Sequence, residues 1–211
     1  MICFAAQWVG EKEVIFYSEF HHTRDAMVKA AWDLLSEADA IITYNGNSFD
    51  IPHLNREFLL AGMPPPAPYA SIDLYRTVRK QFKNASNKLD WVAQQLGVGA
   101  KVSHSGFQLW LDCLKRDPKA WEDMRRYNIG DIKITLAVYK KVLPWITAHP
   151  SVPMYAGQRE GCPNCGSMKH TREGYSYTAT STFQRFRCAN PKCRKWYRGS
   201  TRLDAPEARS L

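Results

Sequence analysis

The sequence predicts an α/β domain followed by a small β-rich metal-binding domain. Three observations lead to this prediction. Apolar runs of strand length alternate with amphipathic helical patterns through residues 1–146. Prolines and a glycine mark a linker at residues 147–157. Four cysteines in two close pairs then fall within residues 158–200, and residues 201–211 form a tail.

The charge of the chain is concentrated near one end. Residues 158–211 hold 11 Lys and Arg and 4 Asp and Glu, whereas residues 1–157 hold 18 and 16. A local basic excess favours a polyanionic partner such as nucleic acid, and an ordinary soluble surface is the alternative. No run of eighteen apolar residues and no charged-then-apolar leader is present, so we expect a soluble, cytoplasmic protein with no membrane contact.

The first part of the chain predicts a hairpin, a helix and a third strand. Residues 3–9 and 14–17 are apolar strand candidates separated by a turn that contains Gly10. Residues 23–38 carry apolar side chains at helical spacing, which is typical of an amphipathic helix. Residues 40–44 then form an apolar run of the length of a buried strand.

Asp50 follows that strand at the start of the next helix. The turn Asn45-Gly46-Asn47 separates the strand from a helix predicted over residues 52–61, with Pro52 near its first position. Such strand-to-helix switches are where α/β proteins bind ligands and metals. The alternative is that Asp50 is an N-cap, which helices favour without any metal.

The second half of the domain predicts one more strand and two helices. Residues 70–75 are a short strand candidate, and residues 89–96 form a helix closed by Gly97. A cap at Asp117 begins a long helix that stops before Pro144. Together these elements predict a mixed sheet flanked by helices on both faces.

Two residues of the long helix have side chains suited to a metal site. Tyr127 and Asp131 are four residues apart and project from one face. If that face looks towards Asp50, the site holds a phenol and two carboxylates, and carboxylates are the ligands that Mg²⁺ and Mn²⁺ prefer. The alternative is a solvated helix on which Asp131 pairs with Arg126 or Lys133.

The order of these motifs resembles a known enzyme family. Asn45-x-x-x-Phe49-Asp50 followed by Tyr127-x-x-x-Asp131 is similar to the second and third motifs of DnaQ-like 3′-5′ exonucleases of the DEDDy branch, which have an RNase H-like fold. Residues 71–74 and 87–92 resemble two further landmarks of those enzymes. The whole span resembles the exonuclease domain of phage and prophage proteins.

The resemblance implies a two-metal hydrolysis of phosphodiester bonds at single-stranded 3′ ends. It implies that Asp50 and Asp131 bind Mg²⁺ or Mn²⁺ and that Tyr127 positions the attacking water. Asn45 and Phe49 are then expected to contact the nucleic acid.

One motif of that family has no counterpart. The family carries Asp-x-Glu on its first strand, and no such motif precedes Asp50 here. We therefore expect an RNase H-like fold that lacks its first strand, is inactive as it stands, and is completed by upstream residues or by a separate chain. The alternative is a non-catalytic nucleic-acid-binding protein derived from such a nuclease.

The four C-terminal cysteines predict a structural zinc site. Their spacing forms two knuckles, which supply four thiolates for tetrahedral Zn²⁺; two disulfides are the alternative. The cysteines are Cys162, Cys165, Cys188 and Cys193. The segment resembles a zinc ribbon.

Basic and aromatic residues alternate around the second knuckle. Guanidinium groups neutralise phosphates and aromatic rings stack on exposed bases, so these residues predict a nucleic-acid-binding surface. The alternative is that the aromatic rings form the small core of the ribbon. The predicted contacts are Arg185, Arg187, Arg194, Lys195, Trp196 and Arg198.

Overall fold

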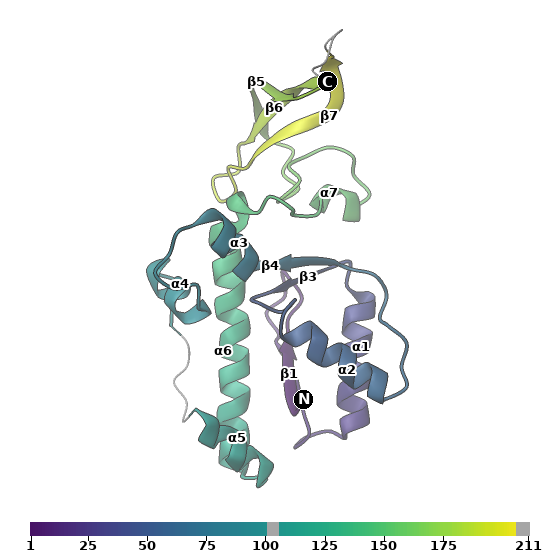
Figure 1. Cartoon of the computed structure of the whole chain (residues 1–211), viewed down its shortest axis with the longest axis vertical. Coiled ribbons are helices and arrows are strands. Elements are labelled where there is room, and N and C mark those ends of the chain that lie inside the picture. Colours follow the sequence, from purple (N-terminus) through teal and green to yellow (C-terminus); the bar gives the residue numbers. More distant parts are fainter. Residues whose placement is uncertain (101–105, 206–211) are drawn as a thin grey trace. The chain divides into compact units, whose positions relative to one another are not determined.

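A computed structural model describes residues 1–100 and 106–205. The chain divides into two compact units, Met1–Lys141 and Val142–Leu211. The fold is mixed α/β, as predicted (Figure 1). The elements of the first unit are β1 (Cys3–Ala6), β2 (Ile15–Ser18), α1 (Arg24–Glu37), β3 (Ala40–Thr43), α2 (Asp50–Leu60), β4 (Ala70–Asp73), α3 (Leu74–Gln81), α4 (Leu89–Gln95), α5 (Phe107–Leu114) and α6 (Pro118–Val142). Those of the second are the 3₁₀ turn η1 (Leu143–Trp145), α7 (Val152–Tyr155), β5 (His170–Thr178), β6 (Ser181–Cys188) and β7 (Trp196–Asp204).

The strands of the first unit form two separate pairs among the described residues. β1 and β2 are antiparallel, as the hairpin pattern predicts, and β3 and β4 are parallel. The predicted mixture of antiparallel and parallel pairing is present, and it is divided between two short sheets. β1 has β2 as its partner and β3 has β4, so one edge of each of these strands has no strand partner within residues 1–100 and 106–205.

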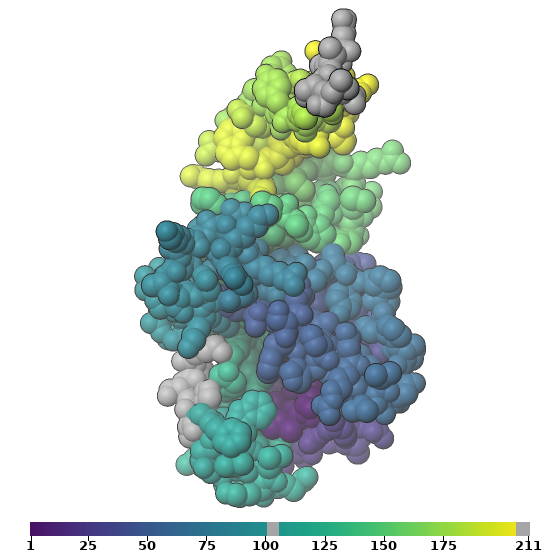
Figure 2. Space-filling view, viewed as in Figure 1, coloured from purple at the N-terminus to yellow at the C-terminus, as the bar shows by residue number. Residues whose placement is uncertain are grey.

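Helices pack on both faces of β1. Cys3 packs against a cluster formed by α5 and α6, which includes Trp121 and Met124. The next residue, Phe4, packs against a cluster formed by α1 and α2, which includes Phe58. Because successive side chains of a strand point to opposite faces, β1 lies between two helical layers. α2 and the proline-rich segment after it reach the outer surface of the unit, drawn in blue in Figure 2, and Leu59 and Leu60 are exposed there.

Local capping explains where several helices begin. The Thr23 hydroxyl accepts a hydrogen bond from the Ala26 N–H at 3.2 Å and starts α1. Asp117 Oδ1 accepts from the N–H groups of Lys119 (2.8 Å) and Ala120 (3.2 Å) and starts α6. Both helices confirm the predictions made from their apolar spacing.

Three helices differ from the sequence prediction. The strand predicted over residues 70–75 ends at Asp73, because the Asp73 carboxylate accepts from the Tyr75 N–H and begins α3 there. α5 and α7 were not predicted. α5 has apolar side chains at exposed as well as buried positions. The alternation of apolar and polar residues that predicts a helix is therefore missing from its sequence.

The second unit is a three-stranded antiparallel sheet in the order β5-β6-β7. Its last strand continues to Asp204, four residues beyond residue 200, which was the predicted end of the ribbon. Residues before the cysteines also belong to this unit. Asn164 is buried, and its Nδ2 donates to the carbonyl of Leu143 at 2.7 Å. The Val152 N–H donates to the carbonyl of Pro163 at 2.8 Å.

No helix within residues 1–100 and 106–205 combines the length and apolar composition needed to cross a bilayer.

Candidate functional sites

The turn between β3 and α2 is held by a buried carboxylate. Asp73 Oδ1 accepts from the Asn45 N–H at 2.9 Å, and Oδ2 accepts from the Asn47 N–H at 3.3 Å. Asn45 adopts φ 65°, a conformation that asparagine tolerates better than most residues. Gly46 lies against Thr43, and a Cβ at that position would approach the Thr43 side chain to 2.5 Å. The turn therefore depends on a residue without a side chain and on the carboxylate of Asp73.

Asp73 also caps α3 through Oδ1, which accepts from the Tyr75 N–H at 3.0 Å. Its carboxylate thus binds three backbone donors and is buried. From the sequence, Asp73 was expected only as part of a family landmark. The position of Asp73 at the end of a strand could have predicted that it caps α3. The spacing of neighbouring residues could not predict that Asp73 also contacts the turn at residues 45–47.

Asp50 is the first residue of α2 and not its cap. Phe49 occupies the N-cap position without a side-chain hydrogen bond, so the N-cap interpretation of Asp50 is not what the structure shows. Asp50 is exposed as a residue, but partial desolvation of its carboxyl group raises its pKa. The charges of Asp73 and Asp131 raise this pKa further, whereas the Asp50 backbone N–H and His53 lower it. Asp50 and Asp131 therefore lie within electrostatic range of each other, although they belong to different helices.

Phe49 and Asn45, the two predicted nucleic-acid contacts near Asp50, differ in which group they present. The Phe49 ring is 59% exposed and lies 4.6 Å from the His53 ring between centroids. An exposed ring beside a carboxylate can stack on a base at the end of a strand. Asn45, in contrast, uses its backbone N–H inside the turn.

Tyr127 and Asp131 lie on α6. Both are half-buried, and Tyr127 packs against the cluster of α5 and α6 side chains that contains Trp121 and Met124. Asp131 is one helical turn further on. The packing of Tyr127 holds its phenol on the same side of α6 as Asp131.

The four paired cysteines form a compact cluster. Their sulfur atoms all lie within 4.8 Å of one another; Cys162 and Cys193 are 3.7 Å apart, and Cys165 and Cys188 are 3.6 Å apart. Tetrahedral zinc with Zn–S bonds of about 2.3 Å needs sulfur atoms about 3.8 Å apart, so the donor set fits this ion. All four thiols are free, which excludes the two-disulfide alternative in this structure. Burial raises the pKa of the Cys162 thiol to about 11.

The strands of the ribbon separate its aromatic residues onto two faces. Phe186 pairs with Tyr197 across β6 and β7, their rings stack at 5.4 Å, and Tyr197 packs on the cysteine cluster. His170 meets the Phe186 ring edge-on at 4.8 Å. These three rings form the small core of the ribbon, which was the alternative to nucleic-acid contact for the aromatic residues.

The opposite face carries the cations, and we call it the arginine face. Arg187 pairs with Trp196 and Arg185 with Arg198, so these four side chains share one face. The guanidinium carbons of Arg185 and Arg187 lie 5.0 and 5.3 Å from the Trp196 ring centroid. The guanidinium carbon of Arg198 lies 3.7 Å from the Phe183 centroid. The arginine face consists of Phe183, Arg185, Arg187, Trp196 and Arg198.

The remaining two predicted contacts lie elsewhere. Lys195 Nζ donates to the carbonyls of Pro144 (3.0 Å) and Ile146 (2.7 Å), and burial lowers the pKa of its ammonium. Its charge is used inside the unit, so we leave Lys195 out of the arginine face. Arg194 is exposed in the second knuckle, at φ 51°.

Comparison with known proteins identifies the first unit. The family model of the RNase H superfamily matches residues 1–143, a span that includes Asp50, Tyr127 and Asp131. The chain belongs to the RNase H superfamily. This membership indicates nuclease-type activity on nucleic acid. No curated protein matches the sequence.

Proposed function

We propose that this protein is a 3′-5′ exonuclease of the DnaQ-like DEDDy type, with a hydrolytic site in the first unit and a zinc ribbon that binds the nucleic acid. The observation that carries the proposal is the match of the RNase H superfamily model to residues 1–143, a span that contains Asp50, Tyr127 and Asp131. Asp50 and Asp131 come from distant parts of the chain, and carboxylates are the ligands that Mg²⁺ and Mn²⁺ prefer.

The described residues fit part of a divalent-metal site. Asp50 and Asp131 would bind Mg²⁺ or Mn²⁺, which supply charge stabilisation to the departing oxygen when bound. Asp73 is assigned to the turn and not to this set, because both oxygens of its buried carboxylate accept backbone hydrogen bonds. Tyr127 would hold the attacking water with its phenol.

The further carboxylates would arrive on an additional strand that carries Asp-x-Glu. Among the residues that the structure describes, β1 and β3 each have one edge without a strand partner, which supports this idea because such an edge can form backbone hydrogen bonds with a new strand. The strand would come from upstream residues or from a separate chain.

The second unit would be held together by Zn²⁺. Cys162, Cys165, Cys188 and Cys193 would bind the ion, and the arginine face would bind the substrate strand. Guanidinium groups beside aromatic rings suit single-stranded nucleic acid, because they neutralise phosphates while the rings stack on bases.

A second candidate is a nucleic-acid-binding protein without hydrolytic activity. One observation favours it. Within residues 1–100 and 106–205, the donor atoms of the four cysteines gather as in a metal site, and no group of three or more carboxylate, histidine or cysteine ligands gathers in this way around Asp50 and Asp131. In this case Asp50 and Asp131 would be remnants of a nuclease.

The test is hydrolysis of a 3′-labelled and a 5′-labelled single strand with Mg²⁺ or Mn²⁺. The chain alone should show little or no hydrolysis, whereas a form supplied with an Asp-x-Glu strand should remove nucleotides from the 3′ end. In that form, Asp50→Ala and Asp131→Ala should nearly abolish turnover, and Tyr127→Phe should slow it without weakening substrate binding. Asp33→Ala, which removes an exposed carboxylate of α1, is the control.

Two results would overturn parts of this account. Robust degradation by the chain alone, abolished by Asp50→Ala, would show that no further strand is needed. Continued inactivity with the strand supplied would favour the second candidate.

A further inference from the structure

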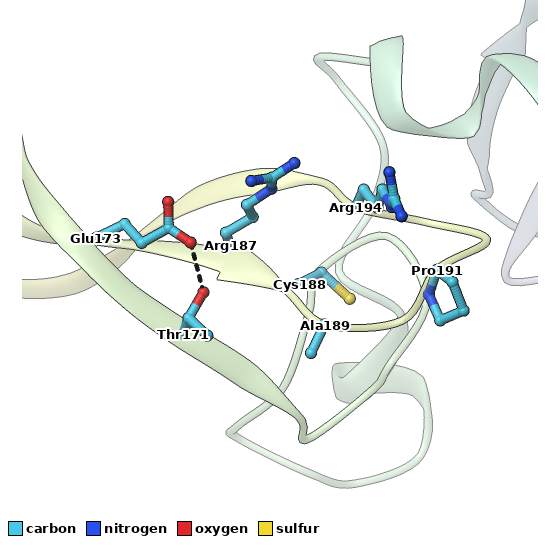
Figure 3. Close-up of a pocket in the computed structure, with 7 residues that line it drawn as sticks. All are labelled: Thr171, Glu173, Arg187, Cys188, Ala189, Pro191 and Arg194. Atoms are coloured by element: carbon cyan, nitrogen blue, oxygen red, sulfur yellow. Dashed lines mark hydrogen bonds between the residues drawn. The ribbon is translucent and has the colours of Figure 1, made fainter.

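The ribbon has a surface cavity of about 330 Å³ that is open to solvent, at one end of the arginine face. It is bordered by β5, β6 and the second cysteine knuckle, as Figure 3 shows. Its lining residues are Thr171, Glu173, Arg187, Cys188, Ala189, Pro191 and Arg194. Arg187 belongs both to the cavity and to the arginine face, so a strand bound along the face can continue into the cavity.

Glu173 is aimed into this cavity by an irregularity of β5. The pairing of β5 with β6 shifts between Arg172 and Tyr175, and Gly174 adopts φ 68°. Such a bulge redirects a side chain. The carbonyls of the bulge are bound by side chains of β6: Arg185 Nε donates to Glu173 O at 2.8 Å, and Gln184 Nε2 donates to Gly174 O at 2.9 Å. The bulge is therefore held by specific contacts.

The Glu173 carboxylate is also oriented by a neighbour. Thr171 Oγ1 donates to Glu173 Oε1 at 2.7 Å, and the pair is drawn in Figure 3. Thr171 lies opposite Arg187 in the register, so hydroxyl, carboxylate and guanidinium share one face of the sheet. The carboxylate retains acceptor capacity for a ligand, since each of its oxygens can accept more than one hydrogen bond.

The cavity is lined by one carboxylate and two guanidinium groups, and this combination favours binding of a base over binding of a phosphate. A phosphate would be attracted by Arg187 and Arg194 but repelled by Glu173. A base has N–H donors for the carboxylate and a flat face on which a guanidinium can stack. Pro191 and Ala189 offer apolar contact to such a face. The two arginines remain able to bind the phosphates on either side of the base.

We propose that this cavity binds an unpaired base and selects guanine, with Glu173 as the residue that determines specificity. Guanine presents two adjacent donors, N1–H and the N2 amino group, to a carboxylate, whereas adenine, cytosine and thymine each present one donor group on the same edge. The inference rests on the proposed binding of single-stranded nucleic acid by the ribbon and adds a base preference to it.

The experiment is a fluorescence anisotropy titration of the full zinc-loaded chain, without Mg²⁺ or Mn²⁺, with labelled oligonucleotides of about 12 nucleotides. One oligonucleotide contains thymine alone, and three others carry a single central guanine, cytosine or adenine. The guanine oligonucleotide should bind about 10-fold more tightly than the thymine one. Because this difference comes from hydrogen bonds to a base, it should persist as salt is raised while all affinities fall.

Glu173→Gln tests the residue, and Glu160→Gln is its matched control. Glu160 is exposed in the same unit and outside the cavity, so its change removes the same charge. Glu173→Gln should reduce the guanine preference to about 2-fold or less, whereas Glu160→Gln should leave it unchanged.

Several results would overturn the proposal. Equal affinity for guanine and thymine oligonucleotides, or an unchanged preference in Glu173→Gln, would show that the cavity does not read a base. Equal tightening of all oligonucleotides by Glu173→Gln, with competition by inorganic phosphate, would identify an anion site. Absence of binding by every oligonucleotide would overturn the binding role of the ribbon, and the base preference with it.

Discussion

The two candidate metal sites differ in how their ligands are assembled. The cysteines come from two short knuckles, and their sulfur atoms gather within 4.8 Å of one another. Asp50 and Asp131 come from two separate helices and do not form a comparable group among the described residues. A structural site needs local turns, whereas a hydrolytic site needs several elements in place at once. The second unit therefore gathers a full set of possible zinc ligands by itself, whereas the proposed hydrolytic site requires further carboxylates.

Loss of the ribbon's metal should have the largest effect. Cys188→Ala, or removal of zinc by a chelator, should unfold residues 158–204 because so small a core depends on the metal for its stability. The segment Leu143–Trp145 should also lose its anchors, since Asn164 and Lys195 bind its carbonyls. Hydrogen exchange measured by mass spectrometry would report both changes, together with zinc content.

The control for this prediction is Cys113→Ala, which alters a buried thiol of the first unit and should leave zinc content unchanged. Amides of β5–β7 that stay protected after zinc removal would contradict the prediction.

The arginine face should carry most of the affinity for nucleic acid. Joint replacement of Arg185, Arg187 and Arg198 by Gln should weaken binding of a single strand by more than about 10-fold at low salt and reduce the salt slope by about 2, since each phosphate contact contributes about 0.7. Titrations at several salt concentrations measure both quantities.

The matched control removes three charges from the same unit outside the face, with Gln at Lys169, Arg172 and Lys192. An equal loss in this control would show that net charge, and not the arginine face, determines binding.

The turn before Asp50 should depend on Asp73. Asp73→Ala removes a buried acceptor of three backbone N–H groups and should lower the free energy of unfolding of the first unit by about 2–4 kcal/mol. Urea denaturation measures the change. Asp33→Ala, on an exposed pair with Lys29, should cost about 0.5 kcal/mol or less. Equal costs would rule out a supporting role for Asp73.

The smallest predicted effect concerns the charge of Asp50. Because its pKa is raised in the folded protein, ionisation of Asp50 opposes folding, and stability contributed by the protonated form is lost as pH rises through that pKa. Without divalent metal, Asp50→Asn should therefore raise the melting temperature slightly at pH 7. The difference should disappear on acidification, and exposed Asp39→Asn should show neither behaviour. A lower melting temperature for Asp50→Asn at pH 7 would contradict this sign.

Features specified by neighbouring residues were predicted from the sequence. The helix after Thr23, the helix after Asp117 and the hairpin of β1 and β2 all follow from caps and apolar spacing. The cysteine spacing likewise predicted a four-thiol group. In each case the determining contacts lie within a few residues or within one repeated motif.

Features that depend on distant pairing were not predictable in this way. Lys195 looks like a nucleic-acid contact in the sequence, but its ammonium binds carbonyls of residues 144 and 146. The division of Trp196 and Tyr197 onto opposite faces follows from the register of β6 with β7, which includes irregularities. The bulge that directs Glu173 also depends on β6.

We infer that the second unit, and not the first, binds nucleic acid. The most direct test is a binding titration that compares the intact chain with a chain that ends at Lys141. Circular dichroism first establishes that the shorter chain is folded. A labelled single strand is then titrated at several salt concentrations, without divalent metal. The shorter chain should bind at least about 10-fold more weakly and with a shallower dependence on salt. Equal affinity and equal salt slope for the two chains would contradict the assignment of nucleic-acid binding to the ribbon.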